Sequence, residues 1–146
     1  MKKMWLFLFL IVQSCYLIPC TFNSDLDVIN EQITAENVSG IYKIEKRTID
    51  YVKGYENSVA YIELKPDGNL IYSDITNHTL NYFNIDTISL VSGIGTWEIK
   101  NKGVYTSINR VGNHWKLFKK NDNYVISQLY GDPDDCLFTR FIKETK

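Results

Sequence analysis

Apolar residues from position 40 onward come in short runs rich in Val, Ile, Tyr, Phe and Thr, and turn residues separate the runs. This composition is typical of β-strands. No helical pattern of about 10–15 residues, which a parallel crossover needs, lies between the runs, so antiparallel neighbours are expected. The pattern predicts eight strands, over Ile41–Lys46, Val59–Leu64, Leu70–Ile75, Ile94–Lys100, Val104–Ile108, His114–Lys119, Tyr124–Leu129 and Cys136–Ile142.

Two of these strands alternate strictly between apolar and polar residues. Trp97 and Ile99 have polar neighbours in the fourth strand, and Trp115 and Leu117 have them in the sixth. Side chains on a strand point alternately to its two faces. Trp97, Trp115 and Leu117 are therefore expected to share one core with Tyr42 of the first strand.

Turn residues join several of the predicted strands directly. Pro66 presets the backbone for a turn and Gly68 accepts a positive φ, which predicts a hairpin over Val59–Ile75. Residues 101–103 and 120–123 join their flanking runs in the same way. Eight short antiparallel strands fit either a closed up-and-down barrel or a two-sheet sandwich.

Length and charge narrow the class of protein. The chain has 146 residues, which is enough for one domain of ordinary size. Hydrophobic residues make up 45% and charged residues 23%, as in a folded globular protein. The formal net charge of -1 supplies no positive field that would attract phosphates, so nucleic acid is not expected as a partner.

Residues 1–20 have the order of a secretory signal. Two lysines precede an apolar run over Met4–Val12, and small and polar residues follow around Cys15. Gln13 interrupts the run before it reaches the roughly 20 apolar residues of a membrane-spanning helix. Export is therefore expected, with an uncleaved N-terminal anchor as the alternative.

The sequence Val12-Gln13-Ser14-Cys15 resembles the bacterial lipoprotein box, in which a small residue precedes the cysteine that receives lipid. The resemblance implies lipidation of Cys15, and a second match makes Cys20 the alternative. The protein would then be anchored by lipid to a membrane of the bacterial cell envelope. Cleavage by a general signal peptidase would instead leave a secreted protein.

Residues 21–38 are polar and weakly patterned. We expect them to form a tether with one helical turn near Leu26–Gln32. The β domain is then expected to occupy residues 39–146.

Residue patterns for catalysis are missing from the sequence. His78 and His114 lie far apart with no metal-ligand spacing around either, and no Gly-x-Ser-x-Gly motif occurs, so no enzyme activity, metal or cofactor is expected. The acidic segment Gly131–Asp135 fits a solvated turn preset by Pro133 better than a Ca²⁺ site. Cys136 is expected to be a buried free thiol or the disulfide partner of a leader cysteine.

Three short motifs carry a family resemblance. Gly40-Ile41-Tyr42, Leu64-Lys-Pro-Asp-Gly and Gly95-Thr96-Trp97-Glu98-Ile99 resemble the bacterial lipocalin-like domains of the calycin type. The resemblance implies an all-β fold, an antiparallel up-and-down barrel or half-barrel of about eight strands. In true lipocalins a Trp of the first strand is capped by a late Arg. Tyr42 and Arg140 take these places here, which implies that they close the barrel together.

The resemblance also implies a function. A small apolar or amphipathic ligand is expected in the barrel, and the long connection over residues 76–91 is the expected rim. Its apolar residues are Tyr82, Phe83, Ile85 and Ile88. The same connection fits an extra irregular strand. The alternative function is a protein-interaction module of the envelope, an inhibitor or assembly factor, with a solid barrel core.

Overall fold

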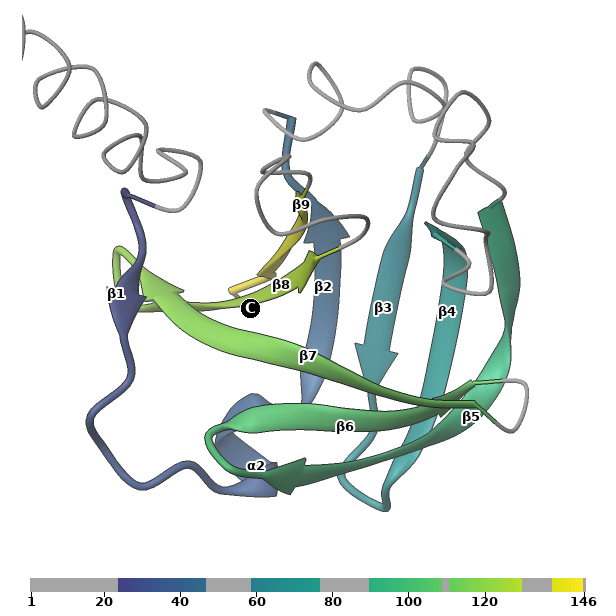
Figure 1. Cartoon of the computed structure of the whole chain (residues 1–146), viewed down its shortest axis with the longest axis horizontal. Coiled ribbons are helices and arrows are strands. Elements are labelled where there is room, and N and C mark those ends of the chain that lie inside the picture. Colours follow the sequence, from purple (N-terminus) through teal and green to yellow (C-terminus); the bar gives the residue numbers. More distant parts are fainter. Residues whose placement is uncertain (1–23, 47–58, 77–89, 109–110, 130–137, 146) are drawn as a thin grey trace, which may run out of the picture.

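The computed structural model describes residues 24–46, 59–76, 90–108, 111–129 and 138–145. In this part of the chain nine strands form one antiparallel sheet, accompanied by a short helix. Figure 1 shows the strands curving around a common interior. The elements are β1 (Asp27–Val28), α2 (Ala35–Val38), β2 (Gly40–Ile44), β3 (Tyr61–Leu64), β4 (Asn69–Thr76), β5 (Leu90–Lys100), β6 (Gly103–Ile108), β7 (Val111–Lys120), β8 (Asn123–Leu129) and β9 (Phe138–Lys143).

The sheet closes on itself through β7, β8 and β9. The strand order is β1-β7-β6-β5-β4-β3-β2-β9-β8, and β7 pairs with β8 as well. Strands β2 to β9 therefore form a closed eight-strand barrel, and β1 is an addition at the side of β7. The prediction of an all-β antiparallel barrel of about eight strands is confirmed, and the two-sheet sandwich is excluded by the β7–β8 pairing.

Each of the eight predicted strands has a counterpart, with shifted ends. The largest difference is in β5, which begins at Leu90, whereas the prediction began at Ile94. The register between β4 and β5 shifts between Tyr72 and Ile75, and Asp74 lies at a φ of 54°. This bulge breaks the period of two on which the sequence pattern depends. Val59, the predicted start of the second strand, is 82% exposed and lies outside β3.

The predicted turn between β3 and β4 is confirmed. The Gly68 amide donates to the Lys65 carbonyl at 3.0 Å, and Gly68 has a φ of 84°, which favours glycine. Asp67 Oδ1 accepts from the Asn69 amide at 3.0 Å, and the hydrogen bonds from Asn69 lower the pKa of this carboxyl. Trp97 Nε1 also donates to the Lys65 carbonyl at 2.8 Å. The turn is thus attached to β5.

The structure differs from the prediction before β2. The helical turn expected near Leu26–Gln32 is wrong, because β1 pairs there with β7, Asp27 opposite Lys119. A two-residue strand carries no readable period, so only this tertiary pairing defines it. The short helix α2 comes later and is capped by Thr34, whose Oγ1 accepts from the Asn37 amide at 3.2 Å.

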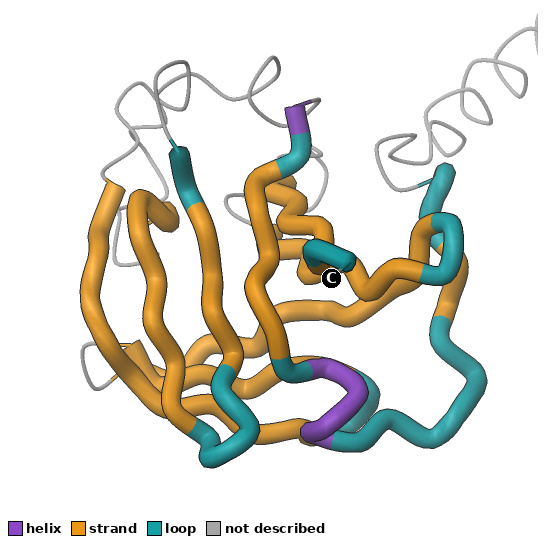
Figure 2. The backbone as a smooth tube through the Cα atoms, turned by 180° about the vertical axis from the view of Figure 1, so that it is seen from behind, coloured by secondary structure: helices purple, strands orange, loops and turns teal. Residues whose placement is uncertain are grey.

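Residues 24–38 lie against the barrel. Ile29 is 2% exposed and Val38 is completely buried. Helix α2 lies at the end of the barrel that also carries the β3–β4 turn (Figure 2). This segment therefore contributes to the core in addition to leading into β2.

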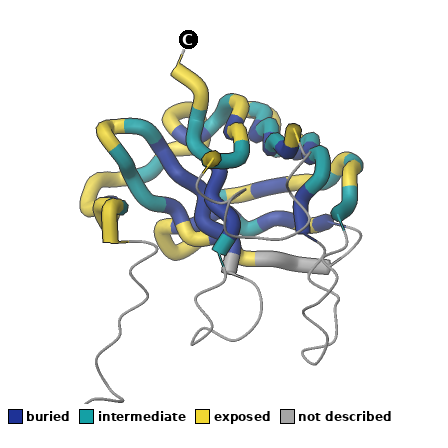
Figure 3. The backbone as a smooth tube through the Cα atoms, turned by 90° about the horizontal axis from the view of Figure 1, so that it is seen from above, coloured by how far each residue is buried: buried dark blue, intermediate teal, exposed yellow. Residues whose placement is uncertain are grey.

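The predicted core is confirmed. Tyr42, Trp97, Trp115 and Leu117 belong to one buried cluster. Figure 3 shows buried positions along the barrel walls and exposed positions at the turns and near the C-terminus. The Tyr42 hydroxyl donates to the Val38 carbonyl at 2.6 Å, and burial raises the pKa of this phenol. Within the described residues no helix is long and apolar enough to cross a membrane.

Candidate functional site

Several predicted site residues lie outside the described residues. They are the lipidation candidates and the rim residues, together with the acidic turn and its neighbouring thiol: Cys15, Cys20, Tyr82, Phe83, Ile85, Ile88, Gly131–Asp135 and Cys136. These assignments stay predictions.

The two residues predicted to close the barrel are both completely buried. Tyr42 bonds to the Val38 carbonyl, as described above. The Arg140 guanidinium binds the Asp25 carboxylate through two nitrogens, at 2.8 and 3.1 Å, and its Nε lies 2.9 Å from Glu45 Oε2. The register places Tyr42, opposite Lys143, on the inner face and Arg140 on the outer face of β9, so the two side chains point to opposite faces, contrary to the predicted closing contact.

Arg140 belongs to a balanced group of two cations and two anions. Lys120 Nζ lies 2.8 Å from Asp25 Oδ2 and 2.5 Å from Glu45 Oε1. The hydrogen bond from Arg140 holds the pKa of Asp25 well below its usual range, and the hydrogen bond to Asp25 raises the pKa of Lys120. Since charges of opposite sign satisfy each other, this group joins the N-terminal segment to the barrel wall and has no unmet charge for a ligand.

A second group of polar side chains lies inside the barrel. Val104, Trp115, Ile126 and Phe141 belong to the core cluster. Residues two positions away along a strand share the same face. On this basis Thr106, Gln128 and Thr139 also face the interior, although each is polar.

Strand register brings these polar residues together. Gln128 is paired with Thr139 across β8 and β9. Lys116 is paired with Ser127, so the next interior residue of β7 beside Gln128 is Trp115. Trp115 is in turn paired with Val104, two positions from Thr106. Gln128 Nε2 donates to the carbonyl of Thr76 at 3.3 Å, across to β4. Thr76 itself contributes only this carbonyl, because its neighbour Ile75, paired with Val91, occupies the interior face. We call the interior group the polar row: Thr106, Trp115, Gln128 and Thr139.

The polar row is deeply buried and incompletely hydrogen-bonded. Its members are at most 5% exposed. Within the described part of the chain, one atom of each side chain lacks a hydrogen-bond partner: Thr106 Oγ1, Trp115 Nε1, Gln128 Oε1 and Thr139 Oγ1. Proteins satisfy about nine in ten buried polar groups, and leaving one unpaired costs about 1–3 kcal/mol. The polar row is therefore a cluster of exceptions to this rule.

The polar row lies near one end of the barrel. Gln128 is the last residue but one of β8, Thr139 is the second of β9, and the Thr76 carbonyl that Gln128 contacts belongs to the last residue of β4. In Figure 1 these strand ends lie at the end opposite α2. The sequence signal for the row is a polar residue at the apolar phase of a strand, as Gln128 two residues after Ile126. Alternation alone does not reveal that these positions adjoin.

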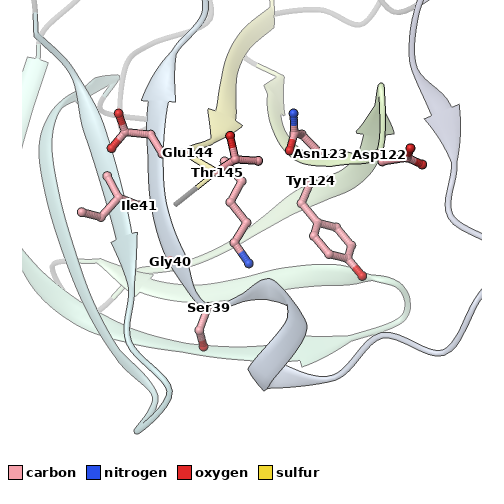
Figure 4. A pocket seen from close by; sticks show the side chains of 9 residues that line it. Ser39, Gly40, Ile41, Asp122, Asn123, Tyr124, Glu144 and Thr145 are labelled. Atoms are coloured by element: carbon pink, nitrogen blue, oxygen red, sulfur yellow. The ribbon is translucent and has the colours of Figure 1, made fainter.

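A pocket of about 680 Å³ opens near the other end of the barrel. Figure 4 shows Asp122 and Tyr124 on one side of it, Ile41 and Glu144 on the other, and Ser39 below. The Tyr124 hydroxyl donates to Glu31, at 3.1 Å, and Glu144 is paired with Lys43.

Lys143 also lines this pocket. Its Nζ donates to the Asn37 carbonyl at 2.5 Å and lies 5.7 Å from the centre of the Tyr124 ring. Burial lowers the pKa of this amine. Tyr124, Lys143 and Glu144 of this pocket therefore already have partners, in contrast to the unpartnered atoms of the polar row.

Hydrogen bonding is the chemistry that the polar row offers. No group of three or more His, Cys, Asp or Glu residues with metal-binding geometry occurs among the residues that the structure describes. His114 is exposed on the outer face of β7, where its ring lies 4.5 Å from that of Tyr105.

Comparison of the chain with protein-family models, with curated proteins and with solved structures gave no match.

Proposed function

We propose that this barrel binds a small amphipathic molecule in its interior, with the polar end of the molecule at the polar row. The observation that carries the proposal is the set of buried, unpartnered atoms on neighbouring interior positions. A barrel of eight strands is either filled by its own side chains or encloses one small ligand. The apolar Ile126 and Phe141 lie next to the row along their strands, which suits a ligand with an apolar part.

Binding requires a displacement at the row. The unpartnered atoms are covered by other protein atoms in the structure described here. A ligand must therefore move what covers them. The free energy needed for this movement is reduced because the covered state already leaves polar groups unsatisfied. The backbone amides at this end should consequently differ in protection from hydrogen exchange between the occupied and the unoccupied barrel.

Titration of the full chain with a naphthalene probe whose fluorescence depends on polarity tests the proposal. Saturable binding of one probe per chain is expected, and Gln128→Leu and Trp115→Phe should weaken it. Ser127→Ala is the matched control, because Ser127 is also buried and unpartnered within the described chain but lies on the opposite face of β8. Absence of binding, or equal weakening by the control, would refute this assignment.

The alternative is a protein-interaction module, and the outer wall favours it at one place. The register places Ile41, Glu63, Ile71 and Ile94 side by side on β2 to β5. Ile94 is 79% and Ile41 42% exposed. Exposed isoleucines on adjoining strands suit a contact surface. If Ile94→Lys abolished the protein's function while ligand binding stayed unchanged, this alternative would be favoured.

Export and lipid attachment at Cys15 complete the proposal. They are supported by the order of the leader, in which two lysines and an apolar run precede Ser14 and Cys15. The barrel would then hold its ligand close to a membrane surface.

A further inference from the structure

The polar row has a defined set of unmet hydrogen bonds. Trp115 Nε1 is a donor only, and Gln128 Oε1 is an acceptor only. The hydroxyls of Thr106 and Thr139 act as either. The Gln128 amide nitrogen is already engaged with the Thr76 carbonyl. A complementary group must therefore offer both an acceptor and a donor.

The charged side chains that face the described interior lie toward the α2 end. Lys119 is paired with Glu31 at 2.6 Å, and Lys143 donates to the Asn37 carbonyl. Lys143 lies four positions from Thr139 on β9, about 13 Å at roughly 3.3 Å per residue. Arg140, next to Thr139, is on the other face of β9 and binds Asp25 and Glu45.

A charged group would be unfavourable at the polar row. A carboxylate or phosphate there would be buried without a cation, and an ammonium group would be buried without an anion. A primary carboxamide fits better, because its oxygen accepts from Trp115 Nε1 while its nitrogen donates to Gln128 Oε1. A hydroxyl group supplies the same two functions with one atom.

Resting on the proposed function, we infer that the ligand of this barrel carries an uncharged polar end with an acceptor and a donor, a carboxamide or an alcohol, attached to an apolar chain. Free fatty acids and alkylamines are disfavoured by the same site. The uncharged row thus determines which class of amphipath enters.

Four probes with one tail test this inference: decanamide, decan-1-ol, decanoate and decylammonium. Each is titrated against the full chain at pH 7 in competition with the naphthalene probe. The carboxamide and the alcohol should bind at least about tenfold more tightly than either ion. Gln128→Leu and Trp115→Phe should remove this preference, and Ser127→Ala should retain it.

The outcomes separate the inference from the proposed function. Binding of decanoate or decylammonium as tight as that of decanamide overturns the inference and leaves the barrel a ligand-binding protein. Failure of all four probes to bind overturns the proposed function itself. If Gln128→Leu or Trp115→Phe does not fold, the nearly isosteric variant Thr139→Val is tested instead. It should likewise lose the preference for the carboxamide and the alcohol over the two ions.

Discussion

Trp97 connects the β3–β4 turn to the barrel interior. Its ring is only 6% exposed and its indole nitrogen donates to the Lys65 carbonyl. Trp97→Ala should lower the free energy of unfolding by about 3–5 kcal/mol, since it removes a large buried side chain. Trp97→Phe should cost less, because it keeps an aromatic ring in the core. Urea unfolding measures both, and an unchanged midpoint for Trp97→Ala would contradict the assignment of the inward face.

Gly95 is required by a close approach of two strands. A Cβ at this position would lie 2.4 Å from the Ser107 carbonyl oxygen, which the β5–β6 pairing fixes. At Gly93 the nearest atom is the side-chain hydroxyl of Tyr72, at 2.8 Å, which can shift. Gly95→Ala should therefore destabilise the protein by about 1–3 kcal/mol, and Gly93→Ala by less. Thermal unfolding of the two variants compares them, and equal losses would argue against the backbone clash.

Thr139 provides a stability test of the polar row. Its hydroxyl is completely buried and has no hydrogen-bond partner among the described residues. Thr139→Val replaces the hydroxyl with a methyl group of similar size, so the unliganded protein should be equally stable or up to about 1 kcal/mol more stable. Chemical denaturation without ligand measures the free energy of unfolding of the variant and the wild type. A loss of stability would mean that the hydroxyl is satisfied in the unliganded protein.

At the scale of elements, the N-terminal segment is attached by Asp25. The Arg140 hydrogen bond lowers the pKa of Asp25 in the folded protein. A carboxyl with a lowered folded-state pKa contributes stability above its unfolded pKa of about 3.9, and this stability is lost as the pH falls below that value. Asp25→Asn should therefore reduce stability at pH 7, and the difference from wild type should shrink toward pH 2.

Unfolding free energies of the two proteins between pH 7 and pH 2 test this coupling. Glu36→Gln is a suitable control, because it also removes one carboxylate but at an exposed position in α2. Parallel pH profiles for wild type and Asp25→Asn would show that the ion pair contributes no pH-dependent stability.

The leader motif makes a prediction for the whole molecule. In bacteria grown with labelled palmitate, the full chain should take up the label, and Cys15→Ser should abolish it. The reason is that lipidation requires the thiol that follows Ser14. Label retained in Cys15→Ser would assign the site to Cys20, and label absent from the unaltered chain would exclude the lipoprotein.

Much of the barrel was predictable because strand patterns and turns are local. The alternation around Trp97 and Trp115 identified inward residues, and Pro66 and Gly68 identified a hairpin. The bulge near Asp74 was not predictable, because it interrupts the period of two. The ion pair between Asp25 and Arg140 joins residues 115 positions apart, and no local pattern marks such a pair.

Local sequence was enough to predict the strand content, the antiparallel pairing of neighbouring strands and the inward positions of Tyr42, Trp97 and Trp115, because these depend on neighbours within a few residues. The closure of the sheet through β7 and β8, and the addition of β1 at its side, became apparent only in the folded barrel. The tertiary structure also decided that Trp115, Gln128 and Thr139 adjoin. The physical reason is that register between strands depends on the packing of the whole core, so a polar residue at an inward position acquires its neighbours only when the barrel closes.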